Sequence, residues 1–123
     1  MTALIRKLLV VDDAETCADI IEMALAGIPG LEVEWAGSAE AGLELLRNGD
    51  VAALITDLEL PGMNGLELLS EVRHLPVIVV SATTDPTAEA TALASGASAF
   101  FQKPFSPAAI RRKIEEVLKE GAS

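Results

Sequence analysis

Short runs of apolar residues recur along the chain, and such runs are typical of strands that helices cover on both faces. They predict strands over residues 7–11, 51–57 and 77–81. Residues 31–36 alternate apolar and polar side chains, which predicts another strand, and residues 99–103 predict a short fifth one. The apolar runs are all far shorter than the ~20 residues that a membrane-spanning helix needs.

Segments with apolar residues at helical spacing lie between these strands. Two helices are predicted over residues 14–26 and 65–73. The other three begin at residues that favour helix starts, either an oxygen-bearing side chain alone or one followed by proline: Ser38, Asp85-Pro86 and Ser106-Pro107. Five helices therefore alternate with five strands along the chain.

This alternation with short connections predicts an α/β fold, in which a parallel sheet lies between two layers of helices. The chain has 123 residues, half of them apolar, and shows no repeat or linker. We therefore expect one domain over residues 1–123, with no effector domain in this chain. In doubly wound sheets of this class, ligands bind where the carboxyl ends of the strands meet the loops.

The composition narrows the possible partners and the compartment. Nine Lys and Arg against nineteen Asp and Glu give a net charge of −10, so most of the surface would repel a nucleic-acid backbone. We expect no nucleic acid and no membrane among the partners. Cys17 is the only cysteine, which excludes an internal disulfide, and the chain opens without a secretory signal. Both features indicate the cytoplasm.

Four of the five predicted strands end at polar or charged residues: Asp12 with Asp13, Asp57, Ser81 and Lys103. Taken singly, such residues commonly cap helices or lie in solvent. Taken together, the three carboxylates would repel one another unless a cation offsets their charge. Hard oxygen ligands favour Mg²⁺, or Mn²⁺ as a second possibility, and Mg²⁺ leaves positions open for phosphate oxygens.

Phosphoryl transfer fits a site of this kind. A metal ion and a cation such as Lys103 offset the charge on the transferred group, while a carboxylate can act as the nucleophile. Asp57 is the candidate nucleophile.

At these positions the chain resembles the receiver domains of two-component response regulators, the CheY-like family, over nearly its whole length. Four motifs carry the resemblance in order: the acidic pair Asp12-Asp13, the segment from Asp57 to Gly65, Ser81-Ala82, and the segment from Gly96 to Phe105 that contains Lys103. Each motif alone is a weak signal, but four in order at strand ends are specific.

The resemblance implies a flavodoxin-like sheet of order 2-1-3-4-5, which brings the first and third strands together. It implies a metal site formed by Asp13 and Asp57, with Asp12 through water and the backbone carbonyl of Glu59. Asp57 would then accept a phosphoryl group that Lys103 and the Ser81 hydroxyl contact.

Switching in the family involves that hydroxyl and a nearby aromatic residue, which matches Phe100 here, and it changes the surface of the fourth helix, fifth strand and fifth helix. Phe100 lacks the hydroxyl of the tyrosine often found there, so a switch would rest on ring packing. Leu60 replaces a frequent methionine, with little consequence. The carboxylate of Glu59 could impede or orient the water that hydrolyses an acyl phosphate.

The implied partners are a sensor histidine kinase or a histidine phosphotransfer protein, and a downstream target protein or phosphorelay. The chain would catalyse only its own phosphorylation and dephosphorylation. Two alternatives stay open: an interaction module that keeps the fold without phosphorylation, and a phosphatase that works through an aspartyl phosphate, in which Glu59 would be the acid or base.

Six further side chains are assigned structural roles. Cys17 lies on the apolar side of its helix and is predicted in the core, and Trp35 is predicted to contribute packing. His74 is expected at a solvated helix end. The run Arg111-Arg112-Lys113 is expected to face water.

Overall fold

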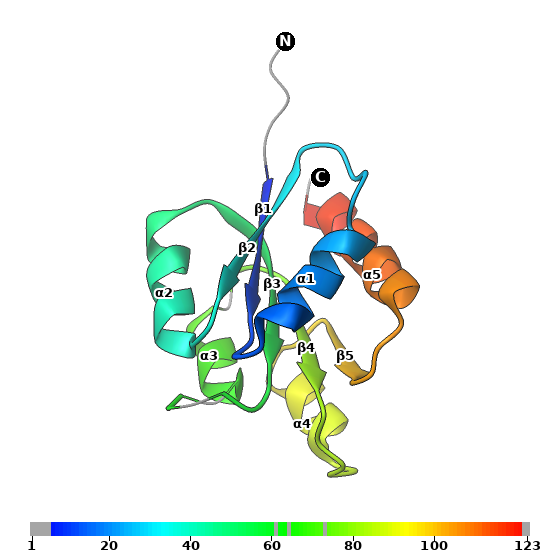
Figure 1. Ribbon diagram of the computed structural model, residues 1–123. Coiled ribbons are helices and arrows are strands. Elements are labelled where there is room, and N and C mark those ends of the chain that lie inside the picture. Colours follow the sequence, from blue (N-terminus) through cyan, green and yellow to red (C-terminus); the bar gives the residue numbers. More distant parts are fainter. Residues whose placement is uncertain (1–5, 61, 64, 73, 122–123) are drawn as a thin grey trace.

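Five parallel strands form one sheet in the order β2-β1-β3-β4-β5 in the computed structural model, which describes residues 6–60, 62–63, 65–72 and 74–121 (Figure 1). The strands are β1 (Arg6–Val11), β2 (Leu31–Ala36), β3 (Val51–Asp57), β4 (Val77–Ser81) and β5 (Ala99–Gln102). The α/β class and the strand order implied by the resemblance are confirmed.

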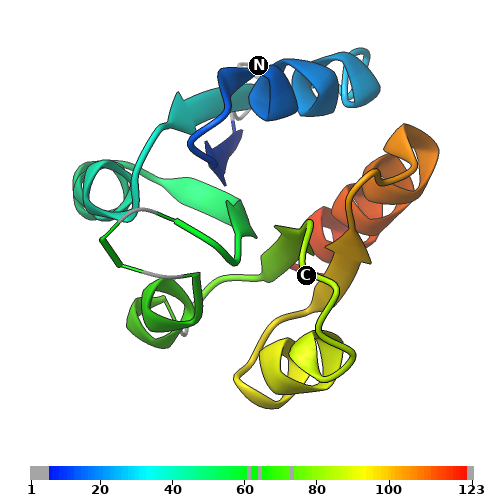
Figure 2. The ribbon, with the colours of Figure 1, turned by 60° about the horizontal axis from the view of Figure 1, so that its bottom comes forward.

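Four helices connect the strands, a fifth follows β5, and together they cover both faces of the sheet. They are α1 (Glu15–Ala24), α2 (Ala39–Asn48), α3 (Gly65–Glu71), α4 (Ala88–Ala94) and α5 (Pro107–Gly121). Figure 2 shows α1 and α5 on one side of the sheet, and α2, α3 and α4 on the other. Every crossover therefore passes over the sheet as a helix, as parallel pairing requires.

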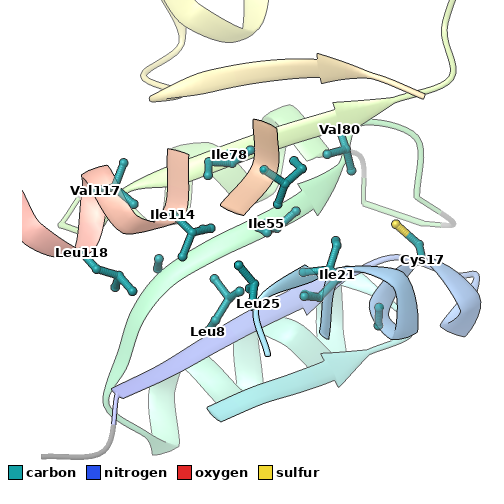
Figure 3. Packing of buried hydrophobic residues seen from close by; sticks show 14 residues of the cluster. Leu8, Cys17, Ile21, Leu25, Ile55, Ile78, Val80, Ile114, Val117 and Leu118 are labelled. Carbon is teal, nitrogen blue, oxygen red and sulfur yellow. The ribbon is translucent and has the colours of Figure 1, made fainter. Parts of the chain in front are cut away.

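The alternation of side chains along the central strands divides the core into two clusters. On β1, Leu8 and Val10 face α1 and α5, whereas Leu9 and Val11 face the opposite layer, and all four are fully buried. Figure 3 shows the first cluster, to which α1 contributes Cys17 and Ile21, the residue after α1 contributes Leu25, and α5 contributes Ile114, Val117 and Leu118. Because both faces are covered, the central strands β1, β3 and β4 carry continuous apolar runs, whereas the edge strand β2 alternates apolar and polar residues.

The ends of several elements differ from the predicted ones. β5 ends at Gln102, so Lys103 follows the strand instead of belonging to it, and β1 begins one residue earlier, at Arg6. α1 is shorter than the predicted 14–26, because the Ala26 N–H bonds to the carbonyl of Met23 in a tighter turn. The third helix was predicted to reach residue 73, which lies outside the described residues, as does Pro61.

The two predicted proline-containing helix starts behave differently. The Ser106 hydroxyl accepts a hydrogen bond from the Ala109 N–H at 3.2 Å and α5 begins at Pro107, as predicted. The prediction for Asp85-Pro86 is wrong by two residues, since α4 begins at Ala88 instead of Pro86. The Asp85 carboxylate instead accepts hydrogen bonds from the backbone and the hydroxyl of Thr87, which closes a local turn before the helix.

One further prediction about a side chain needs correction. Arg111 does not simply face water: its Nη1 donates hydrogen bonds to the carbonyls of Ala24 at 3.0 Å and Ala26 at 2.7 Å. It thereby satisfies carbonyls at the carboxyl end of α1, where basic side chains are favoured. Ile20 of α1 is apolar but 46% exposed. Cys17 is buried and His74 is exposed, as predicted.

Candidate functional site

The candidate site lies where β1, β3, β4 and β5 end. Asp12 and Asp13 follow β1, Asp57 is the last residue of β3, Ser81 is the last of β4, and Lys103 follows β5. Because β1 pairs with β3 and all five strands are parallel, these ends share one edge of the sheet. The strand order alone therefore brings together residues up to 91 positions apart.

Three carboxylates form the centre of the site. Asp12, Asp13 and Asp57 each offer an oxygen, and these oxygens all lie within 4.8 Å of one another. Asp12 is fully buried and Asp57 is 7% exposed, whereas Asp13 is exposed. The cluster is thus anchored in the sheet but open to solvent on the Asp13 side.

One ammonium group lies against two of these carboxylates. Lys103 Nζ donates to Asp12 Oδ2 at 2.7 Å and to Asp57 Oδ2 at 2.9 Å. The peptide bond that follows, Lys103-Pro104, is cis. A single positive charge against three carboxylates leaves a surplus of negative charge, which is an electrostatic environment that favours binding of a divalent cation.

The pKa values of the buried pair reflect this contact. Burial alone would raise the pKa of Asp12, but hydrogen bonds from Lys103, from the Ala14 N–H and from the Cys17 thiol outweigh burial and lower it. Burial alone would lower the pKa of Lys103, but its hydrogen bonds to Asp12 and Asp57 raise it above its ordinary value. Both directions keep the pair charged at neutral pH.

Two backbone N–H groups donate hydrogen bonds to the two buried carboxylates. Asp12 Oδ1 accepts from the Ala14 N–H at 2.9 Å, and Asp57 Oδ1 accepts from the Glu59 N–H at 3.0 Å. Each contact spans two residues and closes the turn that follows the strand. Both carboxylates are therefore oriented by the local chain as well as by Lys103.

Ser81 and the side chain of Glu59 meet beside Asp57. The Ser81 hydroxyl is fully buried, accepts a hydrogen bond from the Thr83 N–H at 3.1 Å and donates to Glu59 Oε1 at 3.5 Å. The contact with Glu59 is long and correspondingly weak. The Ser81 hydroxyl is held only loosely by Glu59 and is available to another oxygen acceptor.

Gly65 allows the segment after Asp57 to fold back on itself. Its N–H donates to the Leu58 carbonyl at 2.8 Å, and a Cβ at this position would collide with the Asp57 carbonyl oxygen and the Leu58 Cα. Glycine is thus required at position 65, because two backbone segments approach closely there and a backbone cannot move aside as a flexible side chain could.

Phe100 lies away from the carboxylates. It is half-buried on β5, opposite Val79 of β4, and packs against the cluster that α2, α3 and α4 cover. Phe100 lies three positions before Lys103 in the chain, and Ser81 pairs with Gln102, two positions after Phe100. The structure therefore places Phe100 between the site and the helical layer that contains α4.

The sequence analysis missed two neighbours of Asp12. Trp35 was assigned only a packing role, yet it is 38% exposed and its Nε1 donates to the Asp12 carbonyl at 2.7 Å. Burial, and then a hydrogen bond to Asp12, raises the pKa of the Cys17 thiol to about 12. The strand order 2-1-3-4-5 could have predicted the contact of Trp35, because it places the end of β2 beside the end of β1.

The donor set fits a hard divalent cation. Within the described ranges, Asp12, Asp13 and Asp57 form the one cluster of acidic, histidine or cysteine side chains close enough to hold a metal ion together. Carboxylate oxygens without nitrogen or sulfur ligands favour Mg²⁺ or Mn²⁺. No helix in the part of the chain that the structure describes is both long and apolar enough to cross a membrane.

Comparisons with known proteins agree with this geometry. A family model of the response regulator receiver domain matches residues 8–115. The chain is 39% identical to a chemotaxis protein CheY homolog of Campylobacter jejuni, over 94% of this chain and 95% of that one. It is 37% identical to the chemotaxis protein CheY1 of Helicobacter pylori, over 91% and 96% of the two chains.

Solved structures give the same result at the level of the fold. A CheY-like response regulator receiver domain protein from Methanospirillum hungatei superposes with a TM-score of 0.85 at 30% identity, covering 96% of this chain and 97% of that one. A response regulator from Chloroflexus aurantiacus gives a TM-score of 0.84 at 33% identity, over 94% and 98% of the two chains.

Proposed function

This chain belongs to the response regulator receiver domain family of two-component signalling, and from that premise we propose that it is a phosphorylation-dependent switch that accepts a phosphoryl group on Asp57. One observation carries the proposal: the Asp57 carboxylate lies among two further carboxylates and a lysine at an open edge of the sheet. A receiver domain is a signalling module rather than an enzyme that turns over external substrates.

The proposed reaction is a transfer to a carboxylate oxygen of Asp57. This oxygen forms a bond to phosphorus while the bond from phosphorus to the donor breaks, and the donor keeps that electron pair. The product is an acyl phosphate. Water later attacks the phosphorus and the bond to Asp57 breaks. The carboxylate is regenerated and inorganic phosphate is released.

The neighbouring residues have separate roles in this proposal. Lys103, already within 2.9 Å of Asp57, would offset negative charge on the phosphoryl oxygens. The Ser81 hydroxyl would leave its 3.5 Å contact with Glu59 and donate to a phosphoryl oxygen. Phe100 would then repack, which changes the surface formed by α4, β5 and α5.

Asp13 and Asp57 would hold Mg²⁺ (or Mn²⁺) directly, with Asp12 through water and the Glu59 backbone carbonyl as a further ligand. When bound, this ion neutralises charge on the transferred group and orients it. The exposure of Asp13 supports this assignment, since a hydrated ion needs an open side.

We propose a sensor histidine kinase or a histidine phosphotransfer protein as phosphodonor, and a protein target for the α4-β5-α5 surface. A mostly apolar hollow of about 260 Å³ beside Lys103, lined by Thr16, Cys17, Ile20 and Phe105 among others, supports docking of a protein donor next to the site. Action inside the cytoplasm, where such kinases present their phosphoryl groups, belongs to the same proposal.

A small phosphodonor tests the proposal without any knowledge of the kinase. We expect acetyl phosphate with Mg²⁺ to add the mass of one phosphoryl group to the intact protein, and the Asp57→Asn variant to gain none. Asp50→Asn is the matched control, because Asp50 lies at the opposite end of β3 and is exposed.

Other outcomes identify the alternatives. Absence of an adduct, together with no spectral change on adding beryllofluoride, would favour an interaction module that works without phosphorylation. Sustained hydrolysis of phosphate monoesters that depends on Glu59 would favour a phosphatase.

A further inference from the structure

Trp35 contacts the site through the backbone rather than through a carboxylate. It is the second-last residue of β2 and pairs with Val10 of β1, and its indole Nε1 donates to the Asp12 carbonyl oxygen at 2.7 Å. This is one of the shortest hydrogen bonds around the site. Trp35 is also the only tryptophan of the chain.

We propose that Trp35 is a positioning residue that sets the direction of Asp13 in the metal site by holding the Asp12–Asp13 peptide group. This inference rests on the proposed function, since it concerns the same Mg²⁺ site. The Asp12 carbonyl and the Asp13 nitrogen and Cα lie in one rigid plane. A bond that fixes the carbonyl therefore fixes where the Asp13 side chain begins.

Asp13 depends on this backbone contact more than its neighbours do. Asp12 is held by its N–H, which donates to the Ala36 carbonyl at 3.1 Å, and by hydrogen bonds to both carboxylate oxygens. No side-chain hydrogen bond orients Asp13 within the described part of the chain, and Asp13 is exposed. Its placement within 4.8 Å of the other carboxylates is thus a consequence of the backbone.

The indole itself is held by close packing on Gly37. A Cβ on Gly37 would lie 3.2 Å from the Trp35 Cζ2 atom, closer than side chains normally approach. The absence of a side chain at this position leaves space for the ring, whose Nε1 reaches the Asp12 carbonyl. The contact therefore depends on two residues: Trp35 donates the hydrogen bond, and Gly37 leaves space for the ring.

The test replaces the indole N–H with sulfur and leaves the ring shape unchanged. Because the chain has one tryptophan, growth of a tryptophan auxotroph on benzothienylalanine changes this site alone. We expect the Mg²⁺ dissociation constant, measured by calorimetry, to rise about threefold to tenfold, the range for loss of one supporting hydrogen bond. Trp35→Phe should show a rise of the same size.

Gly37→Ala provides an independent perturbation, because it leaves the tryptophan in place and only displaces its ring. We expect it to weaken Mg²⁺ binding in the same direction. Gly49→Ala is the matched control: its Cβ would meet only the Leu45 carbonyl at an ordinary 3.4 Å, far from the site, and Mg²⁺ binding should not change.

The thermal midpoint separates positioning from a general loss of stability. An unchanged Mg²⁺ dissociation constant in the benzothienylalanine protein would overturn the inference, whatever happens to its midpoint, while the proposed function would stand. If the unsubstituted protein itself failed to bind Mg²⁺, the proposed function would fall and this inference with it.

Discussion

Cys17 lies at the boundary between the core and the acidic site. Its side chain is 7% exposed and belongs to the cluster under α1 and α5, toward the end where the strands finish (Figure 3). Its thiol also hydrogen-bonds to Asp12, and burial together with this contact raises its pKa to about 12. The thiol is therefore a protonated donor to Asp12 rather than a reactive thiolate.

This raised pKa predicts a loss of stability at alkaline pH. The folded pKa exceeds the unfolded value of about 8.5, so the stabilisation is complete below that value and is lost as pH rises toward the folded pKa. We expect the free energy of unfolding, measured in EDTA, to fall with pH above about pH 9 in the wild type. This fall should be steeper than in Cys17→Ala by up to about 1.4 kcal/mol per pH unit. Urea titrations measure this slope, and equal slopes would contradict the prediction.

At the scale of the elements, hydrogen bonds connect α1 and α5 in addition to the apolar packing in the core. Arg111 of α5 donates to the carbonyls of Ala24 and Ala26, which the carboxyl end of α1 leaves without helical partners. Gly27 follows with a φ of 92°, a conformation that glycine adopts without strain. The end of α1 is therefore fixed by a residue from the last helix.

Replacing Arg111 should loosen this connection. We expect Arg111→Met to lower the free energy of unfolding by about 1 kcal/mol, the contribution of a partly exposed charged hydrogen bond. Arg112→Met is the control, since Arg112 is exposed on the same helix and should change stability little. Equal stabilities of the two variants in urea would show that the capping contact contributes nothing.

At the scale of the whole molecule, the fold gathers negative charge that its own residues neutralise only in part. The chain carries a net charge of −10, and three carboxylates share one edge of the sheet with Lys103 as the cation bonded to two of them. The three carboxylates repel one another, which lowers the stability of the metal-free protein, and the same charges favour binding of a cation.

This opposition predicts that Mg²⁺ reverses the order of stability of two proteins. In EDTA, Asp13→Asn should be more stable than the wild type by under about 1 kcal/mol, because one repelling charge is removed. At a Mg²⁺ concentration 100 times the dissociation constant, the wild type should gain about 2.7 kcal/mol and become the more stable protein.

Thermal unfolding with and without Mg²⁺ measures the reversal, and Asp50→Asn should follow the wild type under both conditions. An Asp13→Asn protein that gains as much stability from Mg²⁺ as the wild type does would exclude Asp13 from the metal site.

The sequence by itself determined the fold class, the approximate elements and the residues at the strand ends. Apolar runs and helix-start residues report local preferences, and the pattern of polar residues after strands is readable without coordinates. Asp12, Asp13, Asp57, Ser81 and Lys103 were all named on this basis. The start of α4 was misplaced because Asp85 closes a turn on Thr87, a choice that depends on local backbone geometry.

The tertiary structure alone decided which side chains meet across these elements. Trp35 reaches the Asp12 carbonyl, Arg111 reaches the end of α1, and Glu59 contacts Ser81. These contacts join residues up to 87 positions apart, and they depend on strand register and on the space a glycine leaves. Periodicity along a chain carries no information of that kind, because it describes each element before the elements are packed together.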